Sequence, residues 1–209
     1  MSSFQFSHVA LRSFAAATPT HLIKFDTSDR RVAKFVKQMG IAQVHLSVTE
    51  QTAVDLGYVA LQQALKQAGW DPCDLDLVIF DTQSPDFLGG VGNADLIHHY
   101  LNLRPDCAAF DLSLGCAAFP YALTVACSML PAAAGEAGDR GIDTRRIAII
   151  IGDIQWSAYK DRETLLAQPH HLFGECTGVI LLEAVSADSC PACTHNLRIL
   201  GLVAAPKTA

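Results

Sequence analysis

The sequence predicts an α/β protein with a well-buried core. Half of its 209 residues are hydrophobic and 17% are charged, which is the composition of a globular protein and not of a disordered chain. Short apolar runs typical of strands alternate with longer segments of helical periodicity. That alternation is typical of helices packed in layers on a sheet.

The first part of the chain contains an expected strand and a short expected helix. Residues Phe4–Ala16 alternate as in a strand, which Thr18-Pro19 ends. A helix is predicted over Asp29–Met39, with Ser28 as its N-cap and Gly40 at its C-terminal end.

A longer helix is expected from Thr49 to Gly69. Its small and apolar residues recur at spacings of three and four, so they form one buried stripe. We assign this stripe to the core, with no chemistry in it. Its members are Ala53, Leu56, Gly57, Ala60, Leu61, Ala64, Leu65 and Ala68.

Further short apolar runs predict the remaining strands. They are Leu75–Phe80, a run ending at Asp111, Arg146–Ile151, Gly178–Glu183 and Asn196–Ala204, with a helix over Asp95–Leu101. The glycine-rich segment Asp81–Asn93 is expected to be a loop. It does not match a phosphate-binding loop, because no Gly-Lys-Ser/Thr follows its glycines.

The segment Cys107–Leu123 carries the expected chemistry. After the run that ends at Asp111 comes a turn containing Gly115, and Cys116 then opens a helix predicted to extend to Ala133. We refer to residues 112–116 as the elbow. Free N–H groups in the first turn of a helix stabilise an anion by about 0.3 to 1 kcal/mol, so Cys116 is expected to ionise readily and to act as a nucleophile. The competing interpretation is a buried cysteine that packs as a small hydrophobic residue.

Two motifs carry a resemblance to a known family. The string DLSLGCAAFPYALTVA, which contains Cys116, resembles the active-site segment of the β-ketoacyl-ACP synthase III group of the thiolase superfamily. The string LFGECTGVILLE, Leu172–Glu183, is similar to a strand entry of the same family. The resemblance implies a mixed five-stranded sheet packed between helices in αβα layers. It also implies an N-terminal thiolase-like domain over residues 1–190, with 191–209 as the start of the following strand or a linker to a second half absent from this chain.

The resemblance implies an activity and the residues that perform it. The expected reaction is acyl transfer from a thioester onto Cys116, followed by condensation or transfer to a second substrate, in fatty-acid or specialised metabolism. Phe87, Leu88 and Phe119 are the expected acyl-binding residues. No metal and no cofactor are expected, because acyl-CoA or an acyl carrier protein thioester is the substrate. His45 lies near the place of a family arginine that helps to hold coenzyme A, so the resemblance leaves the donor open.

The expected partners follow from the same resemblance. In the family a second half supplies a histidine and an asparagine, and no counterpart of either motif is found in this sequence. We therefore predict a second polypeptide carrying the C-terminal half, an acyl carrier protein and a homo- or heterodimer.

Two other functions remain open at the level of the sequence. Ala118, Pro120 and the pair Cys176-Thr177 depart from the resembled motifs and are compatible with a non-catalytic, thiolase-like partner subunit of a heteromeric synthase. A cysteine hydrolase is disfavoured, because Leu114 and Ala118 stand where its nucleophile motif requires glycines.

Charge, hydropathy and cysteine content exclude other classes. A formal charge of −6 and the lack of any Lys/Arg run disfavour nucleic acid or anionic membranes as partners. We recognise no signal peptide and no apolar stretch near 18 residues, so a cytoplasmic location is expected. Seven cysteines without framework spacing are expected to be reduced thiols. Cys190, Cys193 and His195 suggest zinc, but a second pair of ligands is not evident, and a surface loop is the default.

Overall fold

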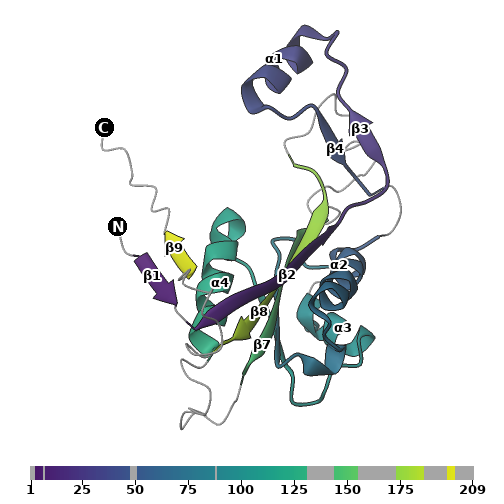
Figure 1. The fold of residues 1–209 in the computed structure, drawn as a ribbon. Coiled ribbons are helices and arrows are strands. Elements are labelled where there is room, and N and C mark those ends of the chain that lie inside the picture. Colours follow the sequence, from purple (N-terminus) through teal and green to yellow (C-terminus); the bar gives the residue numbers. More distant parts are fainter. Residues whose placement is uncertain are drawn as a thin grey trace.

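A mixed five-stranded sheet forms the centre of the protein (Figure 1). The computed structural model describes residues 3–6, 8–47, 51–87, 89–130, 144–154, 173–185 and 197–200. The strands lie in the order β2-β8-β7-β5-β6. Their bounds are β2 Val9–Ala17, β8 Cys176–Ala184, β7 Arg146–Asp153, β5 Leu77–Asp81 and β6 Ala108–Leu112. β5 is parallel to β6 and β7, whereas β8 is antiparallel to β7 and β2. The predicted mixed sheet is confirmed.

Helices cover both faces of this sheet (Figure 1). α2 Ala53–Ala68 and α3 Asn93–Tyr100 pack on one face, and α4 Ala118–Met129 packs on the other. Residues of β5 alternate between the two cores, with Val78 and Phe80 toward α2 and with Leu77 and Ile79 toward α4. The predicted αβα layering is therefore confirmed.

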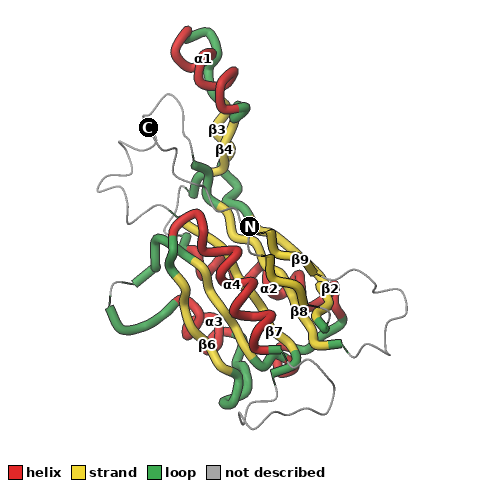
Figure 2. The backbone as a smooth tube through the Cα atoms, turned by 90° about the vertical axis from the view of Figure 1, so that its left-hand side faces the viewer, coloured by secondary structure: helices red, strands yellow, loops and turns green. Residues whose placement is uncertain are grey.

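The edge of the sheet where β5, β6 and β7 end is important for the site, and we refer to it as the carboxyl edge. β2 runs parallel to these strands and also ends there. The chain then forms an arm that extends away from the sheet (Figures 1 and 2). The arm consists of β3 Leu22–Lys24, α1 Arg30–Met39 and β4 Gln43–His45. A small core of Phe25, Val32, Val44 and Leu46 holds it together.

Helix ends follow their local sequence. α2 begins after Thr52, whose side chain caps it, and not at Thr49, and it ends at Gly69 as predicted. For α1 the prediction of Ser28 as N-cap is wrong, because the carboxylate of Asp29 accepts the Arg31 N–H at 2.7 Å. α4 stops at Met129 and not at Ala133, since Leu130 has extended backbone. Leu130 precedes a proline, which disfavours helical backbone at that residue.

The strands at the chain ends differ from the prediction. The expected strand Phe4–Ala16 is two strands, β1 Ser3–Phe6 and β2. β1 is not part of the main sheet and pairs antiparallel with β9 Leu197–Leu200. β9 falls within the strand expected over Asn196–Ala204. The short strands of the arm, β3 and β4, were not predicted, because three residues carry too little alternation to be recognised.

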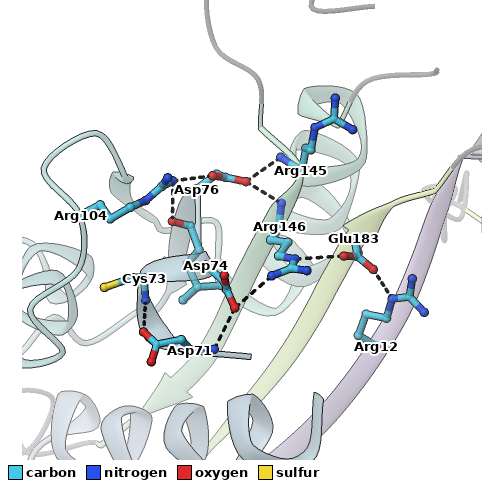
Figure 3. A network of polar contacts seen from close by, with 10 residues as sticks. Arg12, Asp71, Cys73, Asp74, Asp76, Arg104, Arg145, Arg146 and Glu183 are labelled. Atoms are coloured by element: carbon cyan, nitrogen blue, oxygen red, sulfur yellow. Dashed lines mark hydrogen bonds and ion pairs between the residues drawn. The ribbon is translucent and has the colours of Figure 1, made fainter. Parts of the chain in front are cut away.

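A network of charged residues stabilises the opposite, amino edge of the sheet (Figure 3). The Asp76 carboxylate accepts the backbone N–H groups of Arg145 and Arg146 at 2.8 and 2.9 Å and the Arg104 guanidinium at 2.6 Å. Arg146 bridges Asp74 and Glu183 at 3.0 Å each. An open pocket of about 310 Å³ lies among these side chains. Because their charges are paired, we interpret the network as structural.

The described helices also bear on membrane association. None of them is long and apolar enough to cross a membrane.

Candidate active site

The elbow lies at the carboxyl edge, between β6 and α4. β6 ends at Leu112, which is opposite Asp81 of β5. A single 3-10 turn, Gly115–Ala117, then contains the backbone of Cys116, and α4 begins at Ala118. Gly115 has a φ of 65°, the left-handed region that glycine adopts without strain. The structure thus confirms the predicted strand, turn and helix around Cys116, whose side chain is outside the described part.

The N-terminus of α4 differs from those of the other helices. The carboxylates of Asp29, Asp86 and Asp111 accept backbone N–H groups in the first turns of α1, α2 and α3, respectively. In α4 the N-cap residue is Ala117, and no described side chain caps the helix. Because the positive end of the helix dipole is uncompensated there, an anion formed in the elbow would be stabilised.

The other described cysteines are poorly suited to nucleophilic chemistry. Burial raises the pKa of Cys107 to about 11 and that of Cys127 to about 12. Cys176 at the carboxyl edge is exposed, and partial desolvation followed by the charge of Asp153 raises its pKa. Cys73 is exposed at the amino edge. Cys190 and Cys193 lie outside the described residues. Within the described residues, no cluster of His, Cys, Asp and Glu could hold a metal ion.

The predicted acyl-binding residues lie on two segments of the same edge. Phe119 is in the first turn of α4 and is half-buried. Phe87 is 56% exposed in the loop after β5, and Leu88 lies outside the described residues. This loop approaches the elbow, since a Cβ placed on Gly115 would lie 3.9 Å from Oε1 of Gln83. The structure brings the two segments together, and the acyl-binding role of their side chains stays a prediction.

The second motif of the sequence connects the arm to the sheet. Glu175 is 1% exposed and accepts the backbone N–H of Ser47. Two residues later Thr177 is buried opposite Gly152, where a Cβ would come within 2.1 Å of the Thr177 hydroxyl oxygen. His45 contacts the carbonyl oxygen of Pro19 through Nδ1 at 2.7 Å. These contacts give the motif a structural role at the junction of the arm and the sheet.

Two aspartates at the carboxyl edge were not predicted as site residues. Asp153, at the end of β7, accepts hydrogen bonds from the hydroxyl of Thr82 and the N–H of Gln83 through Oδ1, at 2.8 and 2.7 Å. Asp81, at the end of β5, is 5% exposed, and burial and then the charge of Asp153 raise its pKa to about 6. One sequence feature could have indicated Asp81 and Asp153, because each comes at the end of an apolar run that forms a parallel strand. The carboxyl ends of parallel strands lie at the same edge of a sheet.

Comparison with known proteins finds named relatives of this chain. The chain is 33% identical over 188 residues to β-ketoacyl-(acyl-carrier-protein) synthase III of Prochlorococcus marinus (strain MIT 9313), a match covering 87% of this chain and 50% of the relative. The enzyme of the same name from Methylococcus capsulatus is 31% identical over 166 residues, covering 78% and 46%. Over most of its residues the chain is therefore a homologue of proteins named β-ketoacyl-ACP synthase III. It spans about half the length of the curated relatives it matches. No family model matches the chain.

Solved structures show the same fold. A 3-oxoacyl-(acyl-carrier protein) synthase from Burkholderia xenovorans LB400 superposes with a TM-score of 0.72 at 22% identity, over 88% of this chain and 51% of that one. OleA of Xanthomonas campestris gives a TM-score of 0.67 at 18% identity, over 87% and 60%. The fold predicted from the two motifs is thereby confirmed.

Proposed function

We propose that the protein transfers an acyl group from a thioester onto Cys116 and then condenses it with, or transfers it to, a second substrate, in fatty-acid or specialised metabolism. The observation that carries this proposal is the placement of Cys116 in a turn at the uncapped N-terminus of α4. The relatives are named as synthases, which favours catalysis over a non-catalytic partner subunit.

The first half-reaction uses groups that the elbow offers. Sγ of Cys116 attacks the thioester carbonyl carbon, and negative charge develops on the carbonyl oxygen. The backbone N–H of Cys116 is one donor for that oxygen, and the dipole of α4 adds to its stabilisation. The carbon–sulfur bond to the donor thiol then breaks, which leaves an acyl-cysteine.

The second half-reaction requires more than this chain contributes. Condensation with a malonyl thioester forms an enolate, whose charge needs donors beyond the elbow. We infer that a second polypeptide with the C-terminal half supplies them, in a homo- or heterodimer. An uncovered apolar face supports this inference. Phe14 and Leu11 of β2 are 71% and 53% exposed and lie opposite Ile180 and Leu182, on the α4 side of the sheet.

The acyl donor is proposed on the same basis. A carrier-protein thioester suits this chain better than acyl-CoA, because His45 stands near the place where family members carry the arginine for coenzyme A. No cofactor or metal enters the proposed reaction, and the proposed location is the cytoplasm.

Acylation of the assembled protein tests the proposal. The protein is incubated with a short and a medium acyl thioester, each presented on coenzyme A and on acyl carrier protein, and then analysed by denaturing mass spectrometry. We expect one acyl increment that maps to Cys116 and is lost in Cys116→Ala. The matched control is Cys73→Ala, because Cys73 is exposed at the opposite edge of the sheet. Acyl uptake that persists in Cys116→Ala, or no uptake by the wild type, would refute the proposal.

A further inference from the structure

Asp81 is an acid at the carboxyl edge with little exposure to solvent. It is 5% exposed, and no described residue donates a hydrogen bond to its carboxylate. The other aspartates of the carboxyl edge are bonded: Asp86 and Asp111 accept helix N–H groups, and Asp153 accepts the Thr82 hydroxyl. Asp81 therefore differs from its neighbours, because no described donor stabilises its ionised form.

The position of Asp81 points to the elbow. Side chains alternate along β5, and Leu77 and Ile79 pack on the α4 side of the sheet. Asp81 therefore faces the same side, at the edge where α4 begins. Its cross-strand neighbour is Leu112, the first residue of the elbow, and the N–H of Thr82 bonds to the Leu112 carbonyl at 3.1 Å.

The described charges around Asp81 do not neutralise its carboxylate. On its own face the described ionisable groups at this edge are Asp153 of β7 and Cys176 of β8. Asp111 of β6 lies on the opposite face and caps α3. α4 contributes only Tyr121, which is exposed, and Arg146 of β7 lies at the amino edge. The ionisable side chains of α3 are Asp95, His98, His99 and Tyr100, and His98 contacts the Arg104 carbonyl oxygen away from this edge. A carboxyl group that titrates near pH 6, as burial makes Asp81 do, can both take and return a proton at neutral pH.

We propose that Asp81 is the proton-transfer residue of the Cys116 site. The inference rests on the proposed function. As Sγ of Cys116 attacks the thioester carbon, the ionised Asp81 carboxylate takes the thiol proton. When the bond from that carbon to the donor sulfur breaks, Asp81 returns the proton to the departing thiolate. The products are acyl-Cys116 and the free donor thiol, and Asp81 is again ionised.

Single-turnover acylation of the assembled protein between pH 5 and 9 tests this role. In the wild type the rate should fall as pH drops through about 6, because Asp81 then holds a proton. Asp81→Asn should slow acylation at pH 7 by about 10²-fold, the usual contribution of a positioned acid or base, and remove the inflection. Cys116 should remain the acylated residue. Asp106→Asn, an exposed change at the other edge, should keep the wild-type profile.

A second measurement separates this inference from the proposed function. Alkylation of Cys116 by iodoacetamide needs no acyl donor, and its pH profile should show the same inflection in the wild type and lose it in Asp81→Asn. If Asp81→Asn loses the inflection but the wild type takes up no acyl group, proton transfer between Asp81 and Cys116 is supported and the acyl-transfer function is overturned. Identical profiles in both proteins would overturn the role of Asp81.

Discussion

Single aspartates at the carboxyl edge have opposite effects on stability, because their surroundings differ. Asp111 accepts the N–H groups of Asn93 and Ala94 at 2.8 Å each and so stabilises the start of α3. None of the residues that the structure describes donates a hydrogen bond to Asp81, and its burial disfavours the ionised form. A residue kept at a cost in stability is typical of a functional site.

We predict that Asp81→Asn stabilises the protein at pH 8. The pKa of Asp81 is raised in the folded state to about 6 from 3.8. Below pH 3.8 Asp81 is protonated in both the folded and the unfolded protein, so it does not lower the stability. Between the two values the unfolded state ionises first, and above about pH 6 the whole cost of about 3 kcal/mol is present. Urea denaturation should therefore show a gain of up to this size at pH 8 that vanishes near pH 3.5.

Asp111→Asn is the matched control for this prediction. It removes the charge that caps α3, so it should destabilise the protein by about 1 kcal/mol at pH 8. A loss of stability at pH 8 in Asp81→Asn as well would show that the Asp81 carboxylate has favourable contacts in the folded protein.

The sequence indicates Cys116 but not Asp81, for a physical reason. The short turn before a helix and the glycine at position 115 are local features, and the structure confirms both. The importance of Asp81 depends on which groups surround it in space, and its neighbours Leu112 and Asp153 lie 31 and 72 positions away in the chain. No local pattern reports a missing partner.

At the scale of elements, long amphipathic segments are predictable and short ones are not. The buried stripe of α2 contains the predicted residues except Ala68, which is partly buried, and it also includes Val54. Gly57 in it allows close packing, since a Cβ there would lie 3.1 Å from the Phe80 ring. The break between β1 and β2 was missed, because β1 pairs with a strand near the other end of the chain. The alternation that marks a strand does not reveal its partner.

We predict that the amino-edge network sets the stability of the sheet. Asp76→Ala would leave the Arg104 guanidinium and two backbone N–H groups without their acceptor. The expected loss is about 3 kcal/mol in the free energy of unfolding, measured by urea denaturation. Asp106→Asn should cost less than about 0.5 kcal/mol, because that side chain is 74% exposed and its ion pair is 3.5 Å long. Equal losses in both variants would contradict the structural role of Asp76.

At the scale of the whole molecule, the two helical faces differ in polarity. α4 has no charged residue, yet Tyr121 and Met129 on it are exposed. The exposed residues of α2 include Asp55, Gln62 and Lys66, which suit contact with water. A helix that is apolar all round is normally buried on every side, so the α4 side of the sheet is the face that a second half would cover.

The exposed apolar residues on the α4 side of the sheet lead us to predict self-association. Residues 1–209 purified alone should self-associate through the uncovered apolar surface, and Phe14→Glu should make the chain monomeric in sedimentation velocity. Phe14 is 71% exposed, so the variant should unfold within about 0.5 kcal/mol of the wild type. Val59→Glu is the control, because Val59 is also an exposed apolar residue, at 53%, but lies on the outer side of α2 on the other face. It should leave association unchanged. A monodisperse, well-folded wild-type monomer would mean that the α4 face is stable in water and needs no second half.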